Sequence, residues 1–239
     1  MTCYLIRLTL SRDPSIKSVA PLLNPAPGAN EGHAASAHHR LVWSAFSDGS
    51  EAPREFLWRA EDRGVFYVLS PKPPNASVLF EAAEVKPFEP ALNAGDLLDF
   101  RLRVHATVNT PRPGEQRGKR HDIVMHRLKD VPREEWVERR MDVAESAAAE
   151  WLDQQGKRDG FAQLRSCNPD VRLVQDYRVL EIPRQGRLAN DKRHRLRVGV
   201  LDLDGRLEVT DPTVFLERLY RGFGRAKAFG NGLMLIRRV

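Results

Sequence analysis

The first third of the chain switches between strand-like and helix-like spacing of apolar positions. In "YLIRLTL" (residues 4–10) every second residue, from Tyr4 to Leu10, carries an apolar or aromatic side chain. These side chains lie on one side of an extended chain, which predicts a strand. "ASAHHRLVWSAF" (35–46) instead has helical spacing of its apolar residues Leu41, Val42, Ala45 and Phe46. "REFLWRAEDRGVFYVLS" (54–70) predicts two strands around a turn at 62–64, and a further strand follows near 83–85. The order is strand, helix, strand, strand and another strand.

The remainder of the chain repeats this alternation with longer elements. "LLDFRLRVHATV" (97–108) predicts a strand with one apolar face and one largely basic face. A helix is expected at about 133–155, then strands at about 171–182 and 196–200 around a long basic tip. "GRLEVTDP" (205–212) predicts a short strand, after which Asp211 can cap a helix that has Pro212 at its first position. With the final strand "LMLIRR" (233–238), the order is β-α-β-β-α-β.

These patterns predict an α+β protein with two tandem ferredoxin-like (RRM-like) domains. We place the N-terminal domain at residues 1–94 and the C-terminal domain at 95–239. The pattern of elements alone supports this duplication, because the two halves show no clear internal sequence repeat.

Composition narrows the class of protein. Of 239 residues, 41% are hydrophobic and 29% are charged, which fits a folded domain with a proper core. No apolar run reaches the roughly 18 residues that span a membrane, and no signal peptide is recognisable. Cys3 and Cys167 form no metal-binding pair, and the seven histidines lack zinc spacing. We therefore expect a cytoplasmic protein with no metal and no cofactor.

Charge is unevenly distributed along the chain. The net charge is only +6, yet residues 178–197 hold seven basic side chains against two acidic ones, and 218–239 hold six basic and no acidic ones. Residues 134–153 hold seven acids against two arginines, which suggests an outward or partner face. A basic face of this kind favours a folded RNA, held through phosphates and 2′-hydroxyls. The candidate RNA-binding residues are Arg101, Arg103, Lys119, Arg120, Arg187, Lys192, Arg193, Arg225 and Lys227.

The segment "RGFGRAKAFGNGLMLIRR" (221–238) contains four glycines, Gly222, Gly224, Gly230 and Gly232. A dinucleotide-binding loop should follow a first strand and open a helix, whereas these glycines follow a helix and precede a strand. Two compatible interpretations remain. The glycines form a turn that needs positive φ angles, and they allow the backbone to approach RNA phosphates that Arg225 and Lys227 neutralise.

His38 and His39 are candidates for proton transfer, because histidine titrates near neutral pH. They can equally be surface or capping residues of the predicted helix. Periodicity does not choose between the two histidines, since each lies three or four positions from an apolar residue. Outside the acidic helix, no isolated pair of carboxylates supports acid-pair chemistry.

Several stretches together resemble the CasE family of CRISPR repeat-processing endoribonucleases from type I-E systems. "GFGRAKAFGNGLMLIRR" resembles the family's C-terminal glycine-rich signature, and "HRLVWSAF" its histidine helix. "PFEPALNAGDLLDFRLRVHATV" resembles its domain junction, and "LEVTDPTVFLERLYRGFG" its last helix. The matches span nearly the full length in the right order, and the terminal signature is the most specific.

The resemblance implies tandem ferredoxin-like domains and metal-independent cleavage of precursor CRISPR RNA beside each repeat stem-loop. It also implies that the enzyme keeps its product as a subunit of the Cascade interference complex. By that likeness His39 takes the place of the catalytic histidine, with His38 as the fallback. Ser36 stands where the family often has a tyrosine, and Arg184 is our first candidate for stabilising charge on the phosphorane.

Two other classes of function stay open at this point. The departure at Ser36 motivates a non-catalytic subunit that binds the RNA hairpin without cutting it. A nucleotide-dependent enzyme that uses the glycine segment would instead bind mononucleotides tightly.

Overall fold

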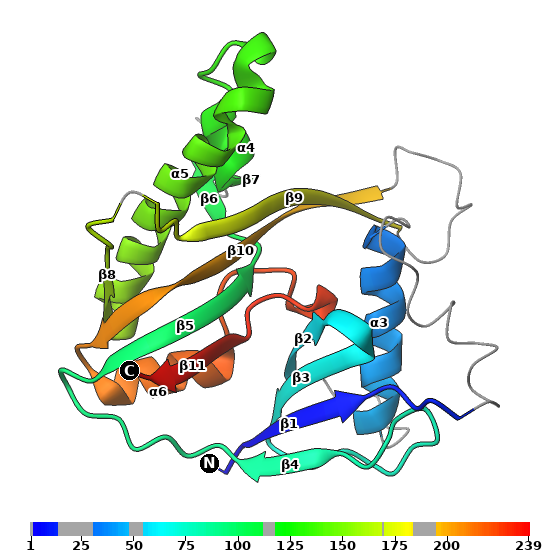
Figure 1. Cartoon of the computed structure of the whole chain (residues 1–239). Helices are drawn as coiled ribbons and strands as arrows, with labels where there is room; N and C mark the ends of the chain where they lie inside the picture. Colours follow the sequence, from blue (N-terminus) through cyan, green and yellow to red (C-terminus); the bar gives the residue numbers. More distant parts are fainter. Residues whose placement is uncertain (1, 14–30, 48–54, 112–117, 169, 184–194) are drawn as a thin grey trace. The chain divides into compact units, whose positions relative to one another are not determined.

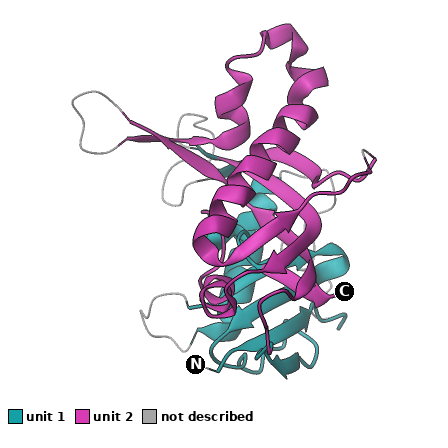
Figure 2. Ribbon diagram, turned by 90° about the vertical axis from the view of Figure 1, so that its left-hand side faces the viewer, with its two compact units in different colours: residues 1–90, 180–197, 226–233 teal, residues 91–179, 198–225, 234–239 magenta. Residues whose placement is uncertain are grey.

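The structure is a computed structural model, and it describes residues 2–13, 31–47, 55–111, 118–168, 170–183 and 195–239. These residues form two compact units, shown in teal and magenta in Figure 2. Unit 1 comprises residues 1–90, 180–197 and 226–233, and unit 2 comprises 91–179, 198–225 and 234–239. The chain thus passes between the two units several times, whereas the predicted division at residues 94/95 has it pass from one domain to the other only once. No helix among these residues has a stretch long and apolar enough to cross a membrane.

Unit 1 contains a four-stranded antiparallel sheet in the order β2-β3-β1-β4 (Figure 1). Its strands are β1 (Tyr4–Thr9), β2 (Leu57–Glu61), β3 (Val65–Ser70) and β4 (Glu84–Pro87). The predicted turn is the short helix η1 (Asp62–Gly64), where Arg63 and Gly64 have positive φ angles of 58° and 73°. This strand order is ferredoxin-like, but residues 71–83 before β4 contain no helix.

Helix α3 (Glu31–Phe46) packs on one face of this sheet. The predicted apolar positions of the helix are buried, and they meet Ile6 and Leu8 from the alternating pattern of β1. The core also receives Trp58 and Phe66 from β2 and β3. The alternating apolar residues of the strand and the helically spaced apolar residues of α3 therefore pack in one core, as the sequence predicts.

Unit 2 contains the second ferredoxin-like sheet, in the order β11-β5-β10-β8, with β9 also paired to β10. Its strands are β5 (Leu97–Val104), β8 (Phe161–Leu164), β9 (Val174–Pro183), β10 (Arg195–Val209) and β11 (Met234–Arg238). The ends of β9 and β10 belong to unit 1. In ferredoxin-like terms the second strand is divided into β8 and β9, which both pair with β10. The predicted β-α-β-β-α-β plan is confirmed, with its second strand divided in this way and with an insertion after its first strand.

One long helix and one shorter helix accompany the sheet of unit 2 (Figure 1). Helix α5 (Trp136–Asp159) follows η2 (Arg133–Glu135) and ends at Gly160, which has a positive φ of 78°. Helix α6 (Pro212–Arg221) begins as predicted, because the Asp211 carboxylate accepts hydrogen bonds from the backbone of Thr213 and Val214, both at 3.1 Å. An insertion between β5 and α5 forms the hairpin β6 (Thr107–Thr110) and β7 (Lys119–Asp122), then α4 (Ile123–Leu128).

Strand β10 differs from the prediction. The sequence predicts separate strands at 196–200 and from 205, but the structure has one strand of 15 residues that continues through Gly205. Gly205 pairs with Phe100 of β5, and a Cβ added to Gly205 would lie 3.0 Å from the Phe100 ring. The ring therefore fills the space that the glycine leaves. Gly205 therefore continues the strand beside the Phe100 ring and does not break it.

Candidate functional site

The two adjacent histidines of α3 lie in different surroundings. The His38 ring packs edge-on against Phe66, with ring centroids 5.1 Å apart, and lies 6.4 Å from Trp58. Burial lowers the pKa of His38 to about 4, so that its imidazole is neutral at pH 7. The half-buried His38 ring therefore packs against the core of unit 1.

His39 lies between two other aromatic rings. Its ring centroid is 6.1 Å from that of Trp43, one turn further along α3, and 6.3 Å from that of Phe229. Ser36 is half-buried one turn before His39, on the same side of the helix. Of the two histidines, His39 has the surroundings that better fit a role outside the core.

Phe229 comes from the glycine-rich segment near the other end of the sequence. Residues 226–233 belong to unit 1, and the short helix η4 (Lys227–Phe229) contacts both α3 and β2. In the sequence this segment and the histidine helix lie nearly at opposite ends of the chain. The structure instead makes them neighbours, and the only sequence signal for this is an aromatic residue between glycines.

All four glycines of the segment have positive φ angles, which confirms the predicted turn. At two of them protein atoms leave little room. A Cβ on Gly224 would lie 2.5 Å from Val104 and 2.6 Å from the carbonyl oxygen of His105. A Cβ on Gly230 would lie 3.1 Å from the Trp58 ring. These two glycines therefore allow the chain to pack closely against itself, which is not the geometry of a phosphate-cradling loop.

The predicted basic tip falls outside the described residues, and with it Arg184, Arg187, Lys192 and Arg193. Its two flanks are described. Glu181 of β9 forms ion pairs with Arg195, at 3.1 Å, and with Arg197, at 3.9 Å. A Cβ on Gly32, in the first turn of α3, would lie 2.1 Å from the backbone oxygen of Glu181. The strand that leads to residue 184 therefore touches the start of the histidine helix.

Two of the predicted RNA-binding arginines are neutralised within unit 2. Arg103 pairs with Asp202 at 2.8 Å, and Arg101 pairs with Asp204 at 3.5 Å. Burial opposes ionisation of Asp202, but Arg103 and Arg178 outweigh it, and the pKa of Asp202 is lowered. These arginines serve at least to hold β5 against β10.

Three other predicted RNA-binding residues are exposed and lack such neutralisation. Lys119 and Arg120 lie on β7, and Arg225 lies in the glycine-rich segment; none of the three forms an ion pair with any residue that the structure describes. The remaining candidate, Lys227, is half-buried in η4. Within the described part of the chain, Lys119, Arg120 and Arg225 therefore carry positive charges that no carboxylate pairs with.

His105 fixes the backbone at Arg225, a role that sequence reasoning missed. The Arg225 N–H donates to the His105 carbonyl at 3.0 Å, while His105 Nδ1 lies 2.7 Å from the Gly199 carbonyl. Asp122 lies 3.8 Å from the same ring and accepts a hydrogen bond from the Tyr177 hydroxyl at 2.9 Å. Burial lowers the pKa of His105, in spite of these acceptors. No local pattern reveals this cluster, because its members come from distant parts of the chain.

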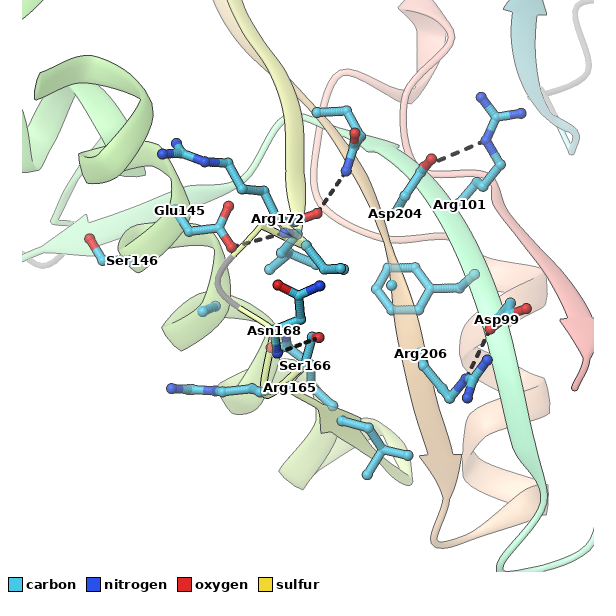
Figure 3. A pocket seen from close by; sticks show the side chains of 18 of the residues that line it. Asp99, Arg101, Glu145, Ser146, Arg165, Ser166, Asn168, Arg172, Asp204 and Arg206 are labelled. Atoms are coloured by element: carbon cyan, nitrogen blue, oxygen red, sulfur yellow. Dashed lines mark hydrogen bonds and ion pairs between the residues drawn. The ribbon is translucent and has the colours of Figure 1, made fainter. Parts of the chain in front are cut away.

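A pocket of about 1110 Å³ lies entirely within unit 2, between α5, residues 165–173 and the sheet. Most of its charged groups are paired with one another: Figure 3 shows Arg101 beside Asp204, and Arg206 beside Asp99. No histidine lines it. The pocket is therefore distinct from the histidine site of unit 1.

The acids of α5 largely bind their own unit. Glu145 accepts hydrogen bonds from the backbone of Leu173 and Val174, at 2.9 and 2.8 Å. Three more acids form ion pairs, namely Asp142 with Arg172, Glu150 with Arg127, and Asp153 with Arg165. Three of the seven acids at 134–153 (Asp142, Glu145 and Asp153) therefore hold the segment between β8 and the start of β9. Among the described residues, no three His, Cys, Asp or Glu side chains are grouped as metal ligands.

Comparison with known proteins gives matches along the whole chain. The sequence profile of the family described as CRISPR associated protein matches residues 3–238. The CRISPR-associated endoribonuclease Cse3 of Thermus thermophilus is 33% identical over 231 residues, which cover 90% of this chain and 96% of the relative.

Solved structures agree with this match. A structure of CRISPR endoribonuclease Cse3 bound to a 19-nucleotide RNA has a TM-score of 0.67 and 25% identity, covering 99% of this chain and 98% of that chain. Thermus thermophilus Cse3 bound to an RNA representing a pre-cleavage complex has a TM-score of 0.66 and 26% identity, covering 99% of this chain and all of the other. The profile match and the 33% identity show that this chain belongs to the CRISPR-associated protein family that its sequence resembles.

Proposed function

We propose that this protein is a CRISPR RNA-processing endoribonuclease that binds the repeat stem-loop and cleaves precursor CRISPR RNA beside it. The observation that carries the proposal is the full-length similarity to the endoribonuclease Cse3, whose RNA-bound structures have the same fold. We further propose that the protein acts in the cytoplasm, keeps its product and serves as a subunit of the type I-E Cascade complex.

The proposed reaction uses no metal. The ribose 2′-oxygen forms a bond to the adjacent phosphorus and the bond from phosphorus to the 5′-oxygen breaks, leaving a 2′,3′-cyclic phosphate and a free 5′-hydroxyl. His39 either accepts the proton of the 2′-hydroxyl or donates one to the 5′-oxygen, typically worth about 10² to 10⁴-fold in rate. Arg184 stabilises the negative charge on the phosphorane, and Ser36 supplies a hydroxyl in place of a tyrosine.

The proposed RNA surface combines the residues that the sequence predicts. Lys119, Arg120 and Arg225 are supported by exposed charge without an ion-pair partner among the described residues. Arg101 and Arg103 are supported less, since each already pairs with an aspartate. The candidates in the basic tip (Arg187, Lys192 and Arg193) and Lys227 of η4 rest on the sequence.

The test is cleavage of the cognate repeat RNA by wild type and His39→Ala in excess EDTA, with analysis of the product ends. We expect wild type to cut and leave a cyclic phosphate, and His39→Ala to lose at least about 10²-fold in rate. His33→Ala, at an exposed histidine of the same helix, is the matched control and should cut normally. Loss of wild-type cleavage in EDTA, or undiminished cleavage by His39→Ala, would refute the mechanism.

A second candidate function is a non-catalytic subunit that binds the RNA hairpin, favoured by Ser36 at the position of the usual tyrosine. The same assay separates the two functions. Tight binding of an RNA that stays intact would support the second, whereas a cyclic-phosphate product excludes it.

A further inference from the structure

The imidazole of His39 is flanked by one ring from its own helix and one from the far end of the sequence. Trp43 is four residues further along α3, and its ring also packs against Phe56, with centroids 5.8 Å apart. Phe229 approaches from η4, with its ring tilted by 58° to the imidazole. Tilted aromatic pairs at such separations attract each other beyond simple burial. The ring of Phe229 can therefore bias the orientation of His39.

The turn that carries Phe229 is tightly built. Ala226 and Gly230, which flank η4, both adopt left-handed conformations, with φ angles of 54° and 76°. Asn231 is fully buried, and its side-chain amide donates to the carbonyls of Ala226 and Phe229, at 3.3 and 3.2 Å. Gly230 lies against the Trp58 ring, where a side chain would meet it at 3.1 Å. These contacts fix the backbone on both sides of Phe229.

We propose that Phe229 is a positioning residue that holds the His39 imidazole in the orientation needed for proton transfer. The proposal rests on the proposed function of His39. Torsions like χ2 of histidine are broad, so the backbone of α3 alone does not fix the ring plane. Proton transfer requires heavy atoms within about 2.6–3.2 Å, and a misplacement of about 1 Å can cost roughly 10²-fold in rate.

The experiment compares single-turnover cleavage and RNA affinity for wild type, Phe229→Leu, Phe229→Tyr and His39→Ala. Leucine keeps apolar bulk but removes the ring, so we expect cleavage about ten-fold slower with a Kd within about two-fold of wild type. Tyrosine restores the ring and should restore the rate. The NMR signals of the His39 imidazole, assigned with His39→Ala, should move in Phe229→Leu through loss of the ring current and stay near wild type in Phe229→Tyr.

A second variant serves as the matched control in the same turn. Ala226→Gly keeps the Phe229 ring and suits the positive φ at this position, so it should cleave at the wild-type rate. If Phe229→Leu does not fold, Phe229→Met, which also lacks a ring, replaces it.

The outcomes separate this proposal from the proposed function. If His39→Ala cleaves normally, His39 is not the catalytic residue and both ideas fail. If His39→Ala is inactive but Phe229→Leu cleaves at the wild-type rate, only the positioning role is refuted. A Phe229→Leu protein with weakened RNA binding and an unmoved His39 signal would also overturn it, because Phe229 would then act on RNA.

Discussion

His38 and His39 differ in what the rest of unit 1 places beside them. The rings that enclose His38 come from β2 and β3, whereas those beside His39 come from α3 itself and from η4. The helical pattern predicts the buried side of α3, but histidine fits both a core and a surface. The likeness to CasE points to His39. The different surroundings of the two histidines come from β2, β3 and η4, which no local pattern connects to the helix.

The burial of His38 predicts a pH-dependent stability. Its pKa falls from 6.5 to about 4 on folding, so the unfolded chain binds an extra proton between these values. The unfolding free energy is therefore unaffected by the titration of His38 above pH 6.5. It decreases as the pH falls from 6.5 toward 4, where the loss amounts to roughly 3 kcal/mol. His38→Phe should therefore show a shallower decline of unfolding free energy between pH 7 and 4.5 than wild type, measured by urea titration.

His33→Gln is the matched control for this prediction, because His33 is exposed on the same helix. Its curve of unfolding free energy against pH should parallel that of wild type. If His38→Phe also parallels wild type, the imidazole of His38 is not buried as the structure has it.

At the scale of elements, local sequence signals work where the element depends on neighbours in the chain. The carboxylate of Asp211 caps α6 as predicted, since a cap needs only the first turn that follows it. Gly205 misleads because its surroundings include Phe100, which belongs to another strand. The ion-pair partners of the acids of α5 are likewise not visible locally, since they include Arg165 and Arg172, which lie beyond the end of the helix.

Glu145 joins two elements, and its removal should destabilise the protein. Both carboxylate oxygens accept backbone hydrogen bonds at the start of β9, from Leu173 and Val174. Glu145→Ala leaves two partly buried N–H groups without this acceptor, and we expect a loss of about 1–3 kcal/mol in unfolding free energy. Glu150→Ala, also on α5, breaks an exposed pair with Arg127 of α4 and should cost at most about 1 kcal/mol. Equal losses by thermal or urea unfolding would contradict this assignment.

At the scale of the whole molecule, the sequence patterns do not predict that segments of the two units alternate along the chain. The order of elements predicts two ferredoxin-like sheets, and both are present with the expected strand orders. That residues 226–233 join unit 1 follows from the packing of Gly230 and Phe229 against Trp58 and His39. Such contacts join positions 172 and 190 residues apart (230 − 58 and 229 − 39), and no periodicity encodes them.

Net charge is also a property of the whole chain, but RNA binding depends on where uncompensated charge lies. Each phosphate that a basic side chain neutralises releases counterions, so the slope of log Kd against log salt counts these contacts. Arg225 is exposed without an ion-pair partner among the described residues, whereas Arg206 pairs with Asp99, which also holds Arg237. Removal of either arginine lowers the net charge of +6 by one unit.

The two variants therefore separate local contact from overall charge. Measured in a His39→Ala background, so that the RNA stays intact, Arg225→Ala should reduce the salt slope by about 1 and weaken binding most at low salt. Arg206→Ala should change the slope less than Arg225→Ala, because the Asp99 carboxylate, which Arg206 shares with Arg237, offsets part of that positive charge. Equal changes in the two variants would mean that RNA responds only to net charge. A reduced slope for Arg206→Ala alone would indicate that RNA contacts β10 of unit 2 and not the glycine-rich segment.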